Sequence, residues 1–489
     1  MGTYELIKGD DKAAAAAEEE HNEHVLAVDH ALPYPKDLEI GGKRASAPRS
    51  GDRHRLVSLD VFRGLTVAVR PFRIACFRRR RFTFPFRFYA LIIAGFPTSS
   101  VRIFLMIFVD DAGTYLPAIN HSPWDGVNLA DFVMPFFLFI VGVALALTYK
   151  RVSNKAMATK KAVLRAAKLF VVGLVIQGGY FHGLHNLTYG VDILSIRWTG
   201  ILQRIAIAYL LAAICEIWLK SDDDVDSGHS LARRYRSQLL VALILTTIYM
   251  ILLYGLYVPD WEYQIPVAGS GPKSFSVECG VRGDTGPACN AVGMIDRRIF
   301  GVRHLHRRPV YERTKQCSID SPASGPLPPD APSWCQAPFD PEGLLSSVMA
   351  IVTCMIGLQF GHVIVHFKDH KDRIVQWMIP SFCLLALAFS LDCFGVHMNK
   401  ALYTLSYTCA TAGTAGMLFT GVYVLVDVYG YRRPTLAMEW LGMHALMIYV
   451  LIGCNVFPVF IQGFYWREPQ NNLVSKPSLA KSSLSVKLM

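Results

Sequence analysis

The chain has 489 residues, of which 52% are hydrophobic and 12% aromatic, and its mean hydropathy is +0.30. This composition is too apolar for a soluble protein of that length and indicates a membrane protein. The net charge of +11 does not indicate a nucleic-acid partner, because eight of the positive charges lie within residues 69–104 and only +3 remains elsewhere.

The first 54 residues contain no apolar run and no cleavage site, so we predict a disordered cytosolic tail without a signal peptide. Residues 55–473 form the predicted transmembrane domain, which includes a segment of unusual composition at 69–104 and a long loop at 259–342. Residues 474–489 are predicted to be a polar tail.

Apolar runs close to the roughly 20 residues that cross a bilayer as a helix recur along the chain. The predicted spans are 88–109, 132–149, 163–181, 199–219, 238–258, 343–367, 374–395, 403–429 and 435–453. The predicted fold class is therefore an all-α polytopic membrane protein, a bundle of about nine transmembrane helices in contact with membrane lipid.

The positive charges of the short loops predict the orientation of the bundle. Residues 150–168 contain seven Lys and Arg, whereas 110–128 contain none and 182–198 contain one. Because short cytosolic loops are enriched in Lys and Arg, the loop after residue 149 is predicted to be cytosolic. The same alternation places His121 and the long loop 259–342 on the lumenal side.

Four of the eleven cysteines share the long loop: Cys279, Cys289, Cys317 and Cys335. An even number of cysteines in a lumenal loop predicts two disulfides, with three pairings open. A zinc site is the alternative, but the usual ligand spacing is absent.

The most informative stretch is NHSPWDGVNLADFVMPFFLFIVGVALAL, residues 120–147. His121 lies in a turn that Pro123 and Gly126 keep from being helical. Asp131 lies about one turn into the next helix, where a carboxylate is costly unless it faces a polar cavity or a partner. Asp110 ends the preceding span at the same depth.

These residues allow two interpretations. An imidazole beside carboxylates at a membrane mouth suits general-base or nucleophilic work. Alternatively, Trp124 and His121 anchor the loop at the headgroup level while the acids cap helix ends. Spacing alone favours the second interpretation.

Several blocks resemble the heparan-alpha-glucosaminide N-acetyltransferase family in its plant-type form. They include RLVSLDVFRGLTVA, LMIFVDDAG, RWTGILQRIAIAYL, FDPEGLLSS, LYTLSYT and NVFPVFIQGFYW, in addition to the stretch around His121. The resemblance runs from residue 55 to about residue 473 and makes the domain acetyltransferase-like. Within it, His121 matches the family's catalytic histidine.

The resemblance implies transfer of an acetyl group from cytosolic acetyl-CoA, without a metal, to a lumenal amino sugar or glycan of the glucosamine type. His121 is the expected catalytic residue, assisted by Asp110 and Asp131. The core-facing arginines Arg63 and Arg204 are expected to hold the donor from the cytosolic side. Asn120, Trp124 and Asp125 are expected to contact the acceptor. The resemblance also implies a location in a lysosomal or vacuolar type of endomembrane, with His121 facing the lumen. It is compatible with a homodimer.

Two departures from the family suggest that this isoform is impaired. The 69–104 insertion interrupts the first span, and an unspliced intron would produce such a segment. We expect residues 88–109 to form the first span instead, and Asp60 and Arg63 to lose their fixed positions in the bundle. The chain also ends in a polar tail where the family continues into another helix. The alternative function is a non-catalytic transporter or channel, but its ionisable residues would lie near mid-span, and here they lie near the span ends.

Overall fold

The computed structural model describes residues 57–68, 120–178, 196–221, 224–225, 227–267, 270–305, 309–337, 341, 343–431, 442 and 444–453. All of them belong to one compact unit of the chain, Leu56–Met489. The predicted tails, the insertion, the replacement span 88–109 and Asp110 lie outside the described residues.

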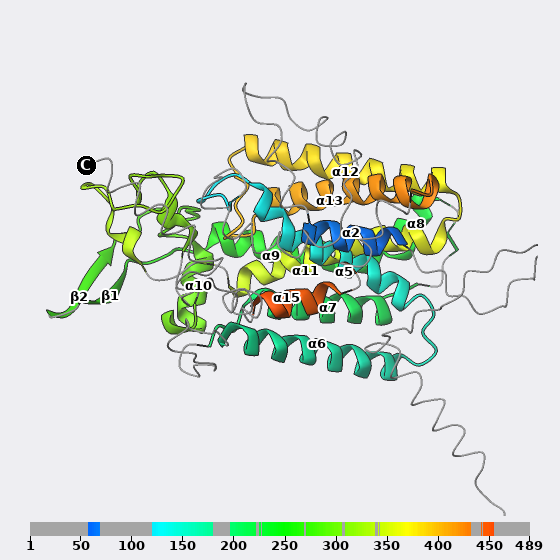
Figure 1. The fold of residues 1–489 in the computed structure, drawn as a ribbon, viewed down its shortest axis with the longest axis horizontal. Helices are drawn as coiled ribbons and strands as arrows, with labels where there is room; N and C mark the ends of the chain where they lie inside the picture. Colours follow the sequence, from blue (N-terminus) through cyan, green and yellow to red (C-terminus); the bar gives the residue numbers. More distant parts are fainter. Residues whose placement is uncertain are drawn as a thin grey trace, which may run out of the picture. The chain divides into compact units, whose positions relative to one another are not determined.

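Helices dominate the described part of the chain, which confirms the predicted fold class (Figure 1). Six are long and apolar enough to cross a membrane: α5 (Val133–Thr148, with the preceding η1, Leu129–Phe132), α7 (Ile201–Trp218), α9 (Arg236–Gly255), α11 (Leu344–His366), α12 (His370–Cys393) and α13 (Leu405–Tyr423, continued by η6, Val424–Val428). The remaining helices of the bundle are α2 (Val57–Ala68), α6 (Lys155–Gly178), α8 (Gly228–Arg234) and α15 (Ala445–Gly453). The count of nine spans stays a prediction.

Burial differs sharply between the spans. In α11, 78% of the most apolar window is buried within the protein, whereas in α9 and in α12 only 17% is buried. Leu243 and Ile251 of α9 and Ile379 of α12 are each about 60% exposed. An apolar surface of this extent would be unfavourable in water and is stable against lipid. Thus α11 is central, and α9 and α12 face the bilayer.

Glycines allow α5 and α11 to pack backbone to backbone. A side chain at Gly357 would overlap the carbonyl group of Phe139, and one at Gly142 would overlap that of Cys354. Gly361, one turn after Gly357, faces Val143 and Ala146 in the same way. Small residues at this spacing let membrane helices approach closely and gain van der Waals contact. The contacts also show that α5 and α11 run parallel.

The direction of the helices separates two ends of the bundle. The starts of α7, α11 and α13 share one end with the last turns of α9. Tyr249 Oη bonds to the Leu402 carbonyl, the Leu344 amide bonds to Asp296, and His304 Nδ1 bonds to the Ile196 carbonyl just before α7. We call this shared end the loop end, because the long loop between α9 and α11 lies there. Residues 149–154 lie at the opposite end, in agreement with the predicted alternation. Which end faces the lumen stays a prediction.

A labelling experiment tests that orientation. Cysteine replacing exposed Lys160 is expected to react with a membrane-impermeant maleimide from the cytosolic side of sealed vesicles. Cysteine replacing Val281, which is 68% exposed in the long loop, should react only after permeabilisation. Both substitutions need a background without the free cysteines. The reverse pattern of labelling would invert the topology.

The long loop carries its own small structure. It contains an antiparallel hairpin of β1 (Trp261–Val267) and β2 (Ser270–Val277), helix α10 (Ala291–Ile299) and the short turns η3 (Val302–His304), η4 (Val310–Arg313) and η5 (Ser333–Gln336). Disulfides join Cys279 to Cys289 and Cys317 to Cys335, so the predicted pair of disulfides is confirmed. Because all four sulfurs are bonded, the zinc alternative is wrong.

The structure corrects the expectation that the insertion displaces Asp60 and Arg63. Helix α2 packs against α5 and α13, and the fully buried ring of Phe62 lies 5.9 Å from Phe136 and 5.7 Å from Phe419 between centroids. Asp60 is buried, and its Oδ1 lies 3.1 Å from Arg63 Nη1. Aromatic packing therefore holds α2 in the bundle although its twelve residues are too few to cross a bilayer.

Candidate active site

The loop before η1 holds His121 at the loop end of the bundle. Asn120 Oδ1 accepts a hydrogen bond from the His121 amide at 2.8 Å, and Ser122 Oγ donates to the Asp125 carbonyl at 2.7 Å. The loop is also tied to the turn before α13, because the Gly126 amide donates to the Met398 carbonyl at 2.8 Å. Gly126 has φ +90°, a conformation that favours glycine. These bonds fix the position of His121.

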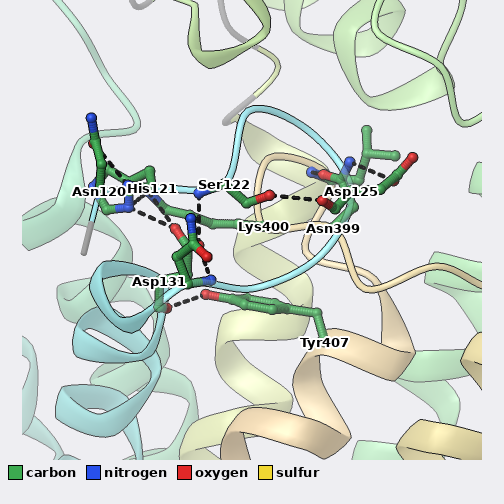
Figure 2. Close-up of polar contacts among 10 residues, drawn as sticks. Asn120, His121, Ser122, Asp125, Asp131, Asn399, Lys400 and Tyr407 are labelled. Carbon is green, nitrogen blue, oxygen red and sulfur yellow. Dashed lines mark hydrogen bonds and ion pairs between the residues drawn. The ribbon is translucent and has the colours of Figure 1, made fainter. Parts of the chain in front are cut away.

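Asp131 lies directly beneath the imidazole (Figure 2). His121 Nδ1 lies 2.6 Å from Asp131 Oδ1, and the amides of Ser122 and Asn128 donate to Oδ2 at 3.0 and 2.9 Å. The Asp131 side chain is fully buried, whereas that of His121 is 31% exposed. Asp131 therefore caps η1 and orients the imidazole at once. The predicted carboxylate partner of His121 is present.

Lys400 is a third member of the site that the sequence analysis missed. Its Nζ lies 3.1 Å from His121 Nδ1 and 3.8 Å from Asp131 Oδ1. Two amide bonds to Asp131 favour its ionised form, which can only accept hydrogen bonds, so we assign the Nδ1 proton to a hydrogen bond with Asp131 and treat Lys400 as a nearby cation. This tautomer leaves the lone pair of His121 on Nε2. The sequence offered one signal for Lys400, its position two residues before the LYTLSYT block that resembles the family.

A tight turn after Lys400 supports this position. Asn399 Oδ1 accepts from the Leu402 amide at 3.0 Å, and Tyr403 adopts a left-handed conformation with φ +59°. Such a conformation is unfavourable for a tyrosine and persists only where the surroundings enforce it. Tyr407, one turn into α13, donates its hydroxyl to the Asp131 carbonyl at 2.5 Å. The start of α13 thus holds both Lys400 and Asp131.

The predicted acceptor-contacting residues lie in different surroundings. Trp124 is buried beneath the long loop, where its Nε1 donates to the Thr285 carbonyl at 3.1 Å and its ring packs edge-on against Tyr311. Asp125 is exposed and accepts from Asn399 Nδ2 at 3.3 Å. Asn120 is half-buried beside His121. Trp124 therefore anchors the His121 loop to the long loop. That these three residues contact the acetyl acceptor stays a prediction.

The two predicted donor-binding arginines come from different helices. Arg204 faces the core, with 2% exposure, and its Nε donates to the Thr199 carbonyl at 3.1 Å. It lies about one turn into α7, at the loop end, which it shares with His121. With the predicted orientation, this position does not fit the expectation that Arg204 holds the donor from the cytosolic side. Arg63 of α2 pairs with Asp60 and its side chain is 31% exposed. Their role toward acetyl-CoA stays a prediction.

Asp296 of α10 joins the long loop to the bundle. Its Oδ1 accepts from the Leu344 amide at 2.8 Å at the start of α11, while its buried Oδ2 has no hydrogen-bond partner among the described residues. Burial raises the pKa of this carboxyl to about 6, although the charge of Arg204 opposes the increase. The carboxyl therefore titrates in the mildly acidic range.

Stability should consequently depend on pH through Asp296. A raised folded pKa contributes stability that is fully present below the unfolded pKa near 4 and is lost as the pH rises through about 6. Asp296→Asn should remove this dependence. Between about pH 4 and pH 6, the free energy of unfolding of the variant should therefore rise relative to that of the natural chain by up to about 3 kcal/mol, at about 1.4 kcal/mol per pKa unit. Thermal unfolding in nanodiscs at several pH values measures it. The exposed Asp330→Asn is the control, and identical pH profiles for all three chains would contradict the assignment.

A second buried pair, at the opposite end of the bundle, was also missed. His362 Nε2 of α11 lies 2.8 Å from Glu216 Oε2 of α7, and Gln238 of α9 donates to the same oxygen at 2.9 Å. Each of these side chains is at most 1% exposed. The pair lies within a turn or so of the ends of both helices, so it ties three spans together near one membrane face. No regular sequence spacing links its members.

The fold and this site define a polytopic helical membrane protein with an oriented histidine at one mouth of its bundle. No family model matches the chain. It is similar to heparan-alpha-glucosaminide N-acetyltransferase of Mus musculus, with 28% identity over 393 residues (75% of this chain and 53% of the relative), and to that of Homo sapiens, with 26% identity over 396 residues (76% and 53%). These alignments confirm the resemblance to the heparan-alpha-glucosaminide N-acetyltransferase family. The chain spans about half the length of these relatives.

Proposed function

We propose that this chain is a transmembrane N-acetyltransferase of an endomembrane. It moves the acetyl group of cytosolic acetyl-CoA to the amine of a glucosamine-type sugar on the lumenal side. The observation that carries the proposal is the 2.6 Å contact between His121 Nδ1 and the buried Asp131 at the loop end. The name of the relatives supports a glucosaminide acceptor and an acetyl donor.

Two routes use this geometry. In the first, His121 Nε2 attacks the thioester carbonyl, the carbon–sulfur bond breaks, and the resulting acetyl-imidazole passes its acetyl group to a neutral amine. In the second, Nε2 removes the proton of the amine while the amine attacks the thioester directly, the carbon–sulfur bond breaks, and the imidazolium returns the proton to the departing CoA thiolate. In both routes Asp131 stabilises the imidazolium that forms.

The remaining predicted residues have roles on either side of this centre. Arg63 of α2 supplies positive charge that the phosphates of acetyl-CoA need, and Arg204 adds positive charge at the loop end, where His121 lies. Asp125 and Asn120 lie on the loop of His121, where a carboxylate and an amide are suitable partners for an amino sugar. The imidazole, 31% exposed, is reachable from the loop end.

A direct assay tests the proposal. The purified chain is incubated in nanodiscs with acetyl-labelled acetyl-CoA and glucosamine, and the expected product is labelled N-acetylglucosamine. The same protein in sealed vesicles is tested for uptake of labelled glucosamine. Uptake without acetylation would overturn the enzyme proposal in favour of a transporter.

Lys400 predicts how activity depends on pH. Its positive charge, 3.1 Å from His121 Nδ1, opposes protonation of the imidazole that Asp131 favours. Lys400→Met should therefore move the acidic limb of the activity profile to higher pH, so that activity at acidic pH falls more than activity at neutral pH. Lys273→Met, in the exposed hairpin, is the control. Equal loss at every pH would indicate that Lys400 serves only packing.

A further inference from the structure

Residues 291–304 of the long loop cross the loop end of three spans. Helix α10 packs against α9 and α11, and Asp296 bonds to the first residue of α11. Further along, His304 Nδ1 lies 2.7 Å from the carbonyl of Ile196, and its ring lies 6.3 Å from that of Trp198, just before α7 begins. The segment therefore lies at the loop end of the bundle, where these helices begin or end (Figure 1).

The outward side of this segment is apolar. Ile299 is 59% exposed and Val302 is 37% exposed. On the neighbouring α7, Ile201 and the preceding Trp198 are exposed to a similar degree, at 38% and 39%. Ile201 is the first residue of a candidate membrane span, so this surface borders the end of a span. Tryptophan at such a boundary is typical of the membrane interface.

Positive charge lies between these apolar residues. Arg298 and Arg303 are both exposed, whereas Arg297 points inward and stacks over the ring of Trp261 at 4.0 Å. Residues 297–308 contain five arginines and no acid. Arginines beside apolar side chains at a membrane boundary are suited to phosphate groups of anionic lipid.

We propose that the surface formed by Trp198, Ile201, Arg298, Ile299, Val302 and Arg303, here called the interfacial surface, lies in the headgroup layer of the protein's own bilayer and binds anionic phospholipid. An anionic glycan would also attract the arginines, but it would leave the four apolar side chains exposed to water. Lipid covers both kinds of group. This inference does not depend on the acetyltransferase proposal.

Photo-crosslinking of the full chain identifies what covers this surface. p-Benzoylphenylalanine replaces Ile299 or, as a second site, Val302, and Ile319 serves as the control because it is 63% exposed elsewhere in the long loop. The protein is placed in nanodiscs of phosphatidylcholine and phosphatidylglycerol with a soluble heparin oligosaccharide, and adducts are identified by mass spectrometry. Irradiation should give several-fold more lipid adduct at positions 299 and 302 than at position 319.

The charge requirement is tested in the same samples. Arg298→Gln combined with Arg303→Gln should lower the share of phosphatidylglycerol among the lipid adducts severalfold, while phosphatidylcholine adducts persist. A variant counts only when both disulfides are intact. Equal lipid adducts at 299, 302 and 319, or adducts mainly with the oligosaccharide, would overturn the proposal. An unchanged phosphatidylglycerol share would overturn its anionic part.

Discussion

Replacing His121 with alanine is expected to lower acetyl transfer by about 10²- to 10⁴-fold, and by more if the imidazole itself carries the acetyl group. The reason is that the buried Asp131, 2.6 Å from Nδ1, orients the His121 imidazole to act as the base or nucleophile. Acetyl-CoA binding should largely persist, because Arg63 and Arg204 remain. Turnover is measured with labelled acetyl-CoA and glucosamine, and binding with labelled acetyl-CoA alone.

His397 provides a matched control for this substitution. It also lies at the loop end near an acid, with Nδ1 3.4 Å from Asp392 Oδ1, but its side chain is 56% exposed and that of Asp392 is 42% exposed. His397→Ala should therefore leave turnover close to that of the natural chain. If His121→Ala acetylates as well as His397→Ala, His121 is an interfacial anchor and the proposed mechanism is wrong.

Replacing Gly357 with leucine is expected to have the largest effect on stability. The first side-chain carbon would already overlap the Phe139 carbonyl, so α5 and α11 would have to separate along their whole glycine contact. Overpacking of this kind typically costs about 1 to 3 kcal/mol, and more where backbone must move. Because α5 follows directly from Asp131, activity should fall as well. Thermal unfolding in nanodiscs measures the loss.

The control for that substitution is Gly255→Leu. Gly255 ends α9, and a side chain there would meet its nearest neighbour, Ile251, only at ordinary contact distance. It should change the unfolding temperature little. A Gly357→Leu chain as stable as Gly255→Leu would show that the close approach of α5 and α11 is not needed.

The parts of the fold that depend on composition and short spacing could be predicted from the sequence. The long apolar runs predicted α5, α7, α9, α11, α12 and α13, because crossing a bilayer requires about 20 apolar residues whatever they pack against. Four cysteines in one loop predicted two disulfides, but not which sulfurs pair, since pairing depends on the folded path of the loop. The closeness of His121 and Asp131 was accessible because only ten residues separate them.

Contacts between distant segments could not be predicted in this way. Lys400 lies 279 residues from His121 in the chain, and only the packing of α13 against η1 brings it to the imidazole. The pairing of Glu216 with His362 depends equally on how α7 meets α11. For α2, the sequence suggested a displaced helix because its length is insufficient for a span, yet aromatic packing around Phe62 is enough to hold it.

Vectorial acetylation in sealed vesicles tests the central proposal most directly. Acetyl-labelled acetyl-CoA is supplied on the side where Lys160 is accessible, and glucosamine is enclosed on the side of the long loop. The proposed mechanism predicts labelled N-acetylglucosamine inside the vesicles, with no acetyl-CoA reaching that side. Product that forms only when both substrates share one side, or glucosamine that crosses the membrane unmodified, would contradict it.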